Sequence, residues 1–143
     1  MQMMLPMFFR GVDKKDPVAV RKRLLQLISD GMFVCPDLLM VTAFAKTGLV
    51  WYYRFEYRPS KTYWNKWLEG ALHADELQFV WGLPLRPDYK DNYDDNDRAV
   101  SKTMIKIWTA YTNTGYACFM NLILRSHLMI DLWYNCHLIN RCD

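Results

Sequence analysis

The segment LVWYYRFEY, residues 49–57, carries the clearest strand signal in this chain. It directly follows Gly48 and is rich in aromatic residues, which favour strands. Its first half is continuously apolar, as is typical of a strand that is buried on both faces of a sheet. One strand cannot form a sheet, and the rest of the chain does not supply the neighbours that it needs. Either another chain therefore provides these neighbours, or the sequence is part of something larger.

Two helices are predicted on the N-terminal side of this segment. Asp16 followed by Pro17 is a typical N-cap and first helical residue, and apolar residues then recur at helical spacing. Gly31 is a stop signal for this helix. Pro36 opens a second helical pattern, which ends near Gly48. The sequence therefore predicts two separate helices before the strand.

Two further helices are predicted on the C-terminal side. Residues 75–81 form a short helix that begins with acidic side chains, which suit the positive end of a helix dipole. The longest helix runs from about Asp95 to Asn113, and Gly115 follows it as a C-cap candidate. The apolar stripe of this helix consists of Val100, Met104, Ile107, Trp108 and Tyr111.

Composition excludes several classes of protein. With 143 residues, of which 52% are apolar and 23% charged, the chain is globular and has the length of one domain. The net charge of +3 is scattered, and the densest basic run is only Arg21 to Arg23, so no nucleic-acid partner is expected. No apolar run approaches the ~20 residues that span a bilayer. The N-terminal MQMMLPMFF lacks a cationic n-region, so no signal peptide is visible in this chain.

Metal and cofactor sites are not expected. The acidic loop around residues 91–97 misses the spacing of a calcium loop, and helix capping explains its carboxylates better. The cysteines have no CxxC spacing, and among the potential zinc ligands near the C-terminus only Cys136 and His137 are close in sequence. The four acidic residues of the loop are Asp91, Asp94, Asp95 and Asp97, and the remaining potential zinc ligands near the C-terminus are Cys118, Cys142 and His127.

The segment GALHADEL, residues 70–77, places His73 beside two acids, Asp75 and Glu76. An unperturbed imidazole titrates near a pKa of about 6.5, which suits proton transfer at neutral pH. From the residues alone, His73 could be a general base, a metal ligand or a helix-capping residue without chemistry. These three interpretations stay open at this point.

Four segments resemble, in order and spacing, the C-terminal third of the type-B carboxylesterases, a family that includes the cholinesterases. They are SDGMFVCP (29–36), AKTGLVWYYRFEYR (45–58), WNKWLEGALHADELQFVWGLPL (64–85) and SKTMIKIWTAYTNTG (101–115). The resemblance covers about residues 16–115. It implies an α/β-hydrolase fold, of which this chain would be the C-terminal part, mostly helical with one or two sheet strands. Residues 1–115 would then be the C-terminal segment of a carboxylesterase domain, and residues 116–143 a divergent tail.

The same resemblance implies roles for individual residues. It makes His73 the general base of a Ser-Glu/Asp-His triad, and it makes Glu76 a buried supporting carboxylate that hydrogen-bonds the loop and is not the triad acid. Trp64 and Trp67 are candidates for lining the substrate gorge. Ala74 stands where the family usually has glycine, which implies a slightly different loop backbone.

A disulfide and several partners are also implied by the resemblance. Cys35 aligns with a family cysteine that bonds to one near the C-terminus, and only Cys118, Cys136 or Cys142 could take that place here. The substrate of the full-length enzyme would be a small-molecule ester, with no cofactor, no metal and no nucleic acid. Full-length members of the family can form homo-oligomers, and they are secreted or associated with the outside of a membrane.

Other parts of the family's catalytic machinery are absent from this sequence. It contains neither a G-x-S-x-G nucleophile elbow nor a glycine-rich oxyanion segment, and its four serines lack elbow flanks. We therefore expect a fragment of a carboxylic ester hydrolase that supplies the general base and is inactive as an isolated chain. The alternative is a non-catalytic, truncated cholinesterase-like protein with at most a binding or adhesion role. The serines are Ser29, Ser60, Ser101 and Ser126.

Overall fold

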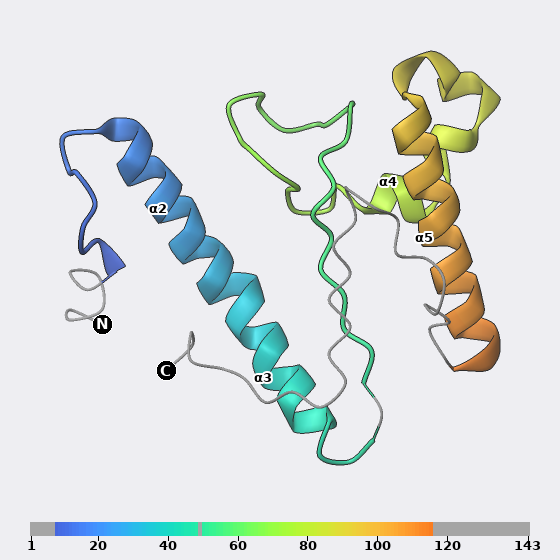
Figure 1. Ribbon diagram of the computed structural model, residues 1–143, viewed down its shortest axis with the longest axis horizontal. Helices are drawn as coiled ribbons and strands as arrows, with labels where there is room; N and C mark the ends of the chain where they lie inside the picture. The colour runs from blue at the N-terminus through green and yellow to red at the C-terminus, as the bar shows by residue number, and fades with distance from the viewer. Residues whose placement is uncertain (1–7, 49, 116–143) are drawn as a thin grey trace. The chain divides into compact units, whose positions relative to one another are not determined.

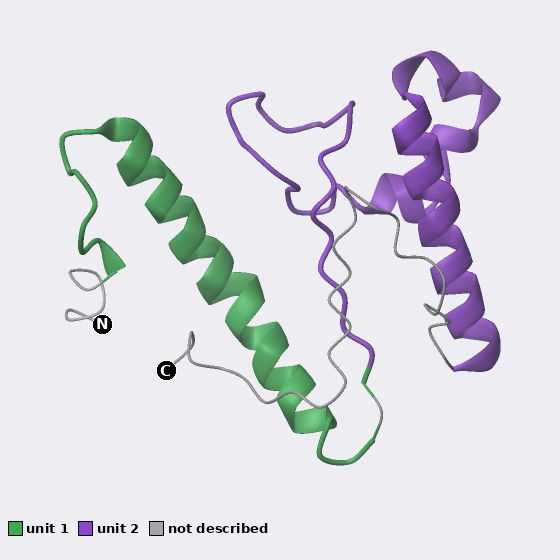
Figure 2. Ribbon diagram, viewed as in Figure 1, with its two compact units in different colours: residues 1–50, 133–143 green, residues 51–132 purple. Residues whose placement is uncertain are grey.

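The computed structural model describes residues 8–48 and 50–115 of the chain. They belong to two compact units, one that contains residues 1–50 and 133–143 and one that contains residues 51–132 (Figure 2). Taken together, the described residues are mostly helical, in agreement with the predicted helical character (Figure 1).

The first unit is built around helix α2, Pro17–Ser29, which begins where the sequence predicts. The Asp16 side chain accepts a hydrogen bond of 2.8 Å from the Val18 backbone N–H, and Pro17 occupies the first helical turn. An N-cap of this kind satisfies one of the backbone donors that a helix start leaves unpaired. The predicted start of this helix is therefore confirmed.

The predicted break between the first two helices is wrong. A π-helical turn, η1 (Asp30–Val34), joins α2 to α3 (Cys35–Phe44), so the chain stays helical from Pro17 to Phe44. In this turn the Cys35 N–H donates to the Asp30 carbonyl, five residues earlier. Pro36 lacks an N–H and would crowd the preceding turn of a regular α-helix. The wider π turn directly before Pro36 removes that conflict, and Gly31 is absorbed within it.

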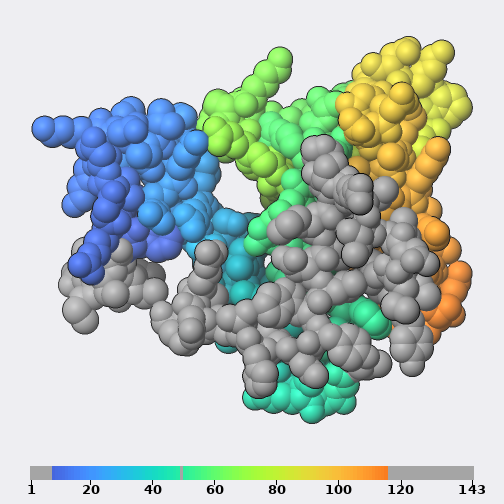
Figure 3. All heavy atoms as spheres, viewed as in Figure 1, coloured from blue at the N-terminus to red at the C-terminus, as the bar shows by residue number. Residues whose placement is uncertain are grey.

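The joined helix corrects the expectation about membrane-spanning length. Its 28 residues have a mean hydropathy of 1.5 over the most apolar 18-residue window, which is long and apolar enough to cross a membrane by length and composition alone. Signal sequences and buried core helices share these properties. No residue of the window is buried, and Leu39, Met40 and Phe44 expose 59–66% of their surface. Atoms of the N-terminal part of this helix, in blue, lie on the face drawn in Figure 3. A helix this apolar on its surface needs a covering, and the described residues of the first unit do not bury it.

The second unit is organised by α5, Asp95–Thr114, the longest helix as predicted. The Asp94 and Asp97 side chains each accept a bond from the other's backbone N–H, at 2.8 and 3.0 Å, which forms a capping box. Gly115 ends the helix with φ 70°, as expected of a C-cap. Three short elements precede it: α4 (Leu77–Val80), η2 (Leu83–Leu85) and η3 (Pro87–Asn92).

The core of the second unit lies between α4 and α5. Phe79 of α4 is completely buried, and it packs with Tyr57, Val100 and Met104. Tyr53, Phe55 and Val80 pack around this cluster. The N-terminal half of the predicted stripe on α5 is thus confirmed, together with Ile107. Trp108 and Tyr111, which complete that stripe, stay 37% and 41% exposed.

The strand predicted at residues 49–57 does not form in the described residues. Residues 50–59 carry no strand or helix hydrogen bonding, although Tyr57 is buried in the core. Its hydroxyl donates to Asp97 at 2.9 Å, so a side chain and not a backbone ladder ties this segment to α5. A strand needs a neighbour, and the part of the chain that the structure describes provides none.

Candidate functional site

His73 lies in a short loop that leads into α4. We call residues 70–76 the histidine loop. Residues 73–76 form its turn, and the His73 side chain is exposed. An exposed imidazole on a loop can reach a group on another segment, which a core histidine cannot do. The loop itself is held from several sides.

Two backbone conformations in the histidine loop are left-handed. Gly70 has φ 74°, which glycine adopts without cost, and Ala74 has φ 67°. Ala74 is the one non-glycine residue with positive φ among those that the structure describes. The residue expected to be glycine by resemblance is therefore alanine in a glycine-like conformation. A left-handed conformation costs an L-residue about 1–2 kcal/mol, so other interactions must hold the loop in place.

Asp75 holds the loop from inside. Its carboxylate is 2% exposed, and its two oxygens accept bonds from the Leu72 N–H at 3.0 Å and from the Thr62 hydroxyl at 3.1 Å. The sequence indicates no more for this residue than a place at the start of a helix. The buried carboxylate that bonds the loop in the structure is thus Asp75, next to the residue for which that role is predicted.

The neighbouring Glu76 is only half-buried, so its predicted burial is wrong, and its role as a supporting carboxylate stays a prediction. The charge of Glu76 affects the pKa of the Tyr53 hydroxyl. Burial raises the pKa of the Tyr53 hydroxyl above its usual value, and the negative charge of Glu76 raises it further, while a hydrogen bond involving Trp108 lowers it. Glu76 therefore lies close enough to Tyr53 to raise the pKa of its hydroxyl.

Gln78 links the histidine loop to the loop before α5. Its amide donates to the Asp75 carbonyl at 3.0 Å, and its oxygen accepts a bond of 2.7 Å from the Tyr93 hydroxyl. Both Gln78 and Tyr93 are buried, and burial is the main cause that raises the pKa of the Tyr93 hydroxyl. Because buried hydrogen bonds are costly to break, the C-terminal end of the histidine loop is fixed to the body of the unit.

Trp64 contacts the loop from outside. Its indole N–H donates to the His73 carbonyl at 3.0 Å, and its backbone N–H donates to the Thr62 hydroxyl oxygen at 3.2 Å. The Arg58 guanidinium donates to the Gly70 carbonyl at 2.8 Å, at the other end of the loop. Trp64 and Trp67 are 44% and 48% exposed. The structure thus brings Trp64 to the candidate base, and gorge lining by either tryptophan stays a prediction.

A second buried carboxylate, Asp97, serves the fold. It is fully buried and accepts bonds from the Tyr57 hydroxyl at 2.9 Å and the Ser60 N–H at 3.2 Å, in addition to its part in the capping box. Burial raises the pKa of Tyr57, and the hydrogen bond to Asp97 and the charges of Asp97 and Asp94 raise it further. Helix capping, which the sequence favours over calcium binding for these acids, accounts for the two carboxylates that take part in the capping box.

Two of the serines have structural roles. The Ser60 hydroxyl donates to Asp97, and the Ser101 hydroxyl donates to the Phe79 carbonyl at 2.8 Å within the core. Ser29 ends α2 in the other unit, and Ser126 lies outside the described residues. The structure thus pairs neither Ser60 nor Ser101 with His73 as a nucleophile and base.

The described residues include the acidic loop around residues 91–97 but only one of the four cysteines, Cys35. Within residues 8–48 and 50–115, no three His, Cys, Asp or Glu side chains gather in a way that could hold a metal ion. Cys35 is disulfide-bonded. Its candidate partners, like His127 and His137, lie outside the described residues, so the pairing stays a prediction. The predicted divergent tail, residues 116–143, lies outside them as well.

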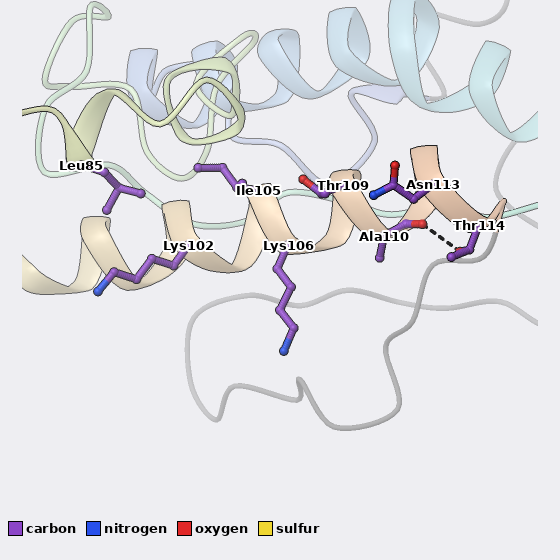
Figure 4. A pocket seen from close by; sticks show the side chains of 8 residues that line it. All are labelled: Leu85, Lys102, Ile105, Lys106, Thr109, Ala110, Asn113 and Thr114. Atoms are coloured by element: carbon purple, nitrogen blue, oxygen red, sulfur yellow. Dashed lines mark hydrogen bonds between the residues drawn. The ribbon is translucent and has the colours of Figure 1, made fainter.

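A shallow groove of about 550 Å³ runs along the outer side of α5, from Lys102 to Thr114, with Leu85 at one end (Figure 4). The surface of the groove consists almost entirely of apolar atoms of these residues. The Lys102 and Lys106 side chains extend away from the helix. The Thr114 hydroxyl donates to the Ala110 carbonyl at 2.7 Å beside it. No residue of the histidine loop lines this groove, so the groove is separate from the candidate base.

Comparisons with known proteins agree on one family. The sequence model described as the carboxylesterase family matches residues 2–118. Acetylcholinesterase-1 of Trittame loki is 33% identical over 109 residues, which cover 75% of this chain and 19% of that protein. Acetylcholinesterase of Gallus gallus is 32% identical over 105 residues (73% and 13%), and cholinesterase of Mus musculus is 32% identical over 104 residues (72% and 17%). The chain spans about a fifth or less of the length of these relatives.

Proposed function

Because the chain belongs to the carboxylesterase family, we propose that it is the part of a cholinesterase-like carboxylic ester hydrolase that carries the general-base histidine, His73. In this proposal the chain is a portion of an α/β-hydrolase domain. The remaining members of the triad, a serine and a Glu or Asp, belong to the rest of that domain. The proposal concerns the role of this chain within the larger enzyme and not activity of the chain alone.

The observation that carries the proposal is the geometry of the histidine loop. The His73 side chain is exposed, whereas the backbone on both sides of it is bonded, at the Leu72 N–H and at the His73 carbonyl. A base that must meet a nucleophile from another segment needs an accessible ring on a fixed backbone. A capping or core histidine would need neither.

The chemistry would follow the Ser-His-acid scheme. His73 accepts the proton of the serine hydroxyl as its oxygen attacks the ester carbonyl, and then gives the proton to the leaving alcohol. In the second half, His73 takes a proton from the water that attacks the acyl-enzyme, and it returns this proton to the serine oxygen as the acid is released. In α/β-hydrolases the order along the chain is serine, acid, histidine, and a histidine in a late segment of the domain fits that order.

The whole enzyme would act on small-molecule esters, in agreement with its family. Secretion, or attachment to the outside of a membrane, and assembly into homo-oligomers are proposed for the full-length protein on the same basis. Trp64 and Trp67 are proposed to border the path to His73, and Glu76 to support the loop. Trp64 has one observation in its favour, the hydrogen bond of its indole to the His73 carbonyl.

A chimera tests the role of His73. Residues 2–118 would replace the matching segment of Trittame loki acetylcholinesterase-1, and hydrolysis of a thiocholine ester would be measured. We expect His73→Ala to lower kcat by roughly 10³-fold or more, as loss of a triad member does. Lys66→Ala changes an exposed residue of the preceding loop and should leave kcat unchanged. Equal kcat for His73→Ala and the unchanged chimera would refute the proposal.

A second candidate function applies to the chain as given. Its sequence has no G-x-S-x-G, which favours a non-catalytic protein that acts through binding or adhesion if the chain occurs alone. A fluorophosphonate probe that reacts with activated serines distinguishes the two cases. No labelling of the purified chain is expected, and stoichiometric labelling would show that it contains an active nucleophile of its own.

A further inference from the structure

The backbone around His73 is bonded by two side chains that approach it from different segments. The Asp75 carboxylate accepts from the Leu72 N–H, and the Trp64 indole donates to the His73 carbonyl. We propose that Asp75 and Trp64 are positioning residues for His73, which together fix the direction in which its imidazole leaves the loop. Their importance for catalysis rests on the proposed function of His73, but the positioning itself does not.

Asp75 is built into the structure for this contact. An almost fully buried carboxylate is unfavourable unless its oxygens are hydrogen-bonded, and each of its oxygens has a donor. One donor is the Leu72 backbone, inside the loop, and the other is the Thr62 hydroxyl, outside it. The carboxylate therefore connects the residue before His73 to a separate segment of the chain.

Thr62 joins the two halves of the arrangement. While its hydroxyl donates to Asp75 at 3.1 Å, the same oxygen accepts the Trp64 backbone N–H at 3.2 Å. The indole of Trp64 then reaches the His73 carbonyl at 3.0 Å. The bonds form a closed path from Leu72 through Asp75, Thr62 and Trp64 to His73.

The indole bond has a specific structural consequence. Tryptophan has a single side-chain donor, and in Trp64 it is directed at the carbonyl that precedes Ala74. Ala74 is the residue with φ 67°, so the peptide held by Trp64 is the one that enters the left-handed turn. Without that bond the peptide is free to rotate toward a conformation that alanine prefers, and the His73 side chain would turn with it.

Nuclear magnetic resonance of the full 143-residue chain tests the proposal without any ester. The imidazole signals of His73 are identified by the variants His127→Asn and His137→Asn, and hydrogen exchange of the Leu72 amide is measured beside them. The test variants are Asp75→Ala, Asp75→Asn, Thr62→Val and Trp64→Phe. Asp91→Ala is the matched control, because Asp91 is an exposed acid of the same unit.

We expect Asp75→Ala to speed exchange of the Leu72 amide roughly tenfold or more, the effect of losing a bond to a charged acceptor. The same variant and Trp64→Phe should shift and broaden the His73 imidazole signals, while the methyl signals of Met104 in the core stay in place. Asp75→Asn keeps an acceptor and should restore slow exchange. Asp91→Ala should behave as the unchanged chain.

Two results would overturn the proposal. One is an unchanged His73 spectrum in both Asp75→Ala and Trp64→Phe. The other is a set of changes in His73 that appears only together with changes at Met104, because that shows a general loss of structure. If Asp75→Ala does not fold, two milder variants decide the question: Trp64→Phe removes the bond to the His73 carbonyl, and Thr62→Val removes the two bonds of the Thr62 hydroxyl. Loss of activity in the chimera tests the role of His73 as a base separately.

Discussion

Replacing Ala74 by glycine should stabilise the second unit. Ala74 has φ 67°, a conformation that costs an L-residue about 1–2 kcal/mol and glycine nothing. Glycine also makes the unfolded chain more flexible, which costs about 0.4–1 kcal/mol. Because Ala74 is exposed, its methyl group contributes little packing that could be lost. The net expected gain in the free energy of unfolding is about 0.5–1 kcal/mol.

A gain of this size raises the melting temperature by roughly 2–8 °C for a unit of this length. Thermal and urea unfolding followed by near-ultraviolet circular dichroism would measure it. The matched control is Ala71→Gly, at a position in the same loop without positive φ, which should lose stability because it gains flexibility and relieves no strain. If Ala74→Gly destabilises the chain as much as Ala71→Gly does, the left-handed turn is not strained and the reasoning fails.

Three further outcomes follow from single contacts in the second unit. Asp97→Ala should lower the free energy of unfolding, measured in urea, by about 2–4 kcal/mol, because the Tyr57 hydroxyl and two backbone N–H groups lose their acceptor. The control variant Asp91→Ala should change it little. Gly82→Ala should cost about 1–2 kcal/mol, since φ is 71° and a Cβ would meet Ile105 Cδ1 at 3.2 Å; equal stability would contradict this. Because the pKa of Tyr57 is raised in the folded chain, the unfolded chain releases the hydroxyl proton first, and the free energy of unfolding should fall as the pH rises above the ordinary pKa of 10.0. A Tyr57→Phe variant whose stability falls as steeply would exclude Tyr57 as the cause.

Local signals in the sequence are reliable guides to the helices. Asp16 and Gly115 can be recognised because a cap acts on the few residues next to it, and both cap their helices in the structure. Pro36 is misleading because its effect depends on the turn before it, and a single π turn lets the helix continue. Residues 50–57 have the composition of a strand, but strands depend on neighbours that no local pattern supplies.

In the candidate site, too, the roles of some residues depend on the folded structure and cannot be read from a local sequence pattern. His73 can be singled out because its surroundings resemble a known family, and the structure places it in a loop, as the sequence suggests. The role of Asp75 cannot be found in this way, because Asp75 and Glu76 look equivalent in sequence and differ only in which of them faces Thr62 and the Leu72 amide. Burial decides between neighbouring acids, and burial is a property of the folded chain.

The helix from Pro17 to Phe44 is apolar and exposed. Two aspartates in this helix help to decide whether protein or lipid suits it better as its surroundings. Asp30 and Asp37 both lie within it, and an aspartate at the centre of a bilayer costs about 2.5–3.5 kcal/mol. Two such costs offset much of the benefit of burying its leucines in lipid, whereas a protein environment can supply hydrogen-bond donors to each carboxylate. The family match includes this helix, and the aligned segment is 19% of the Trittame loki relative. Under the proposed function, length and apolarity therefore suit a helix enclosed by the rest of a carboxylesterase domain at least as well as a membrane span, and the two carboxylates favour the enclosed helix.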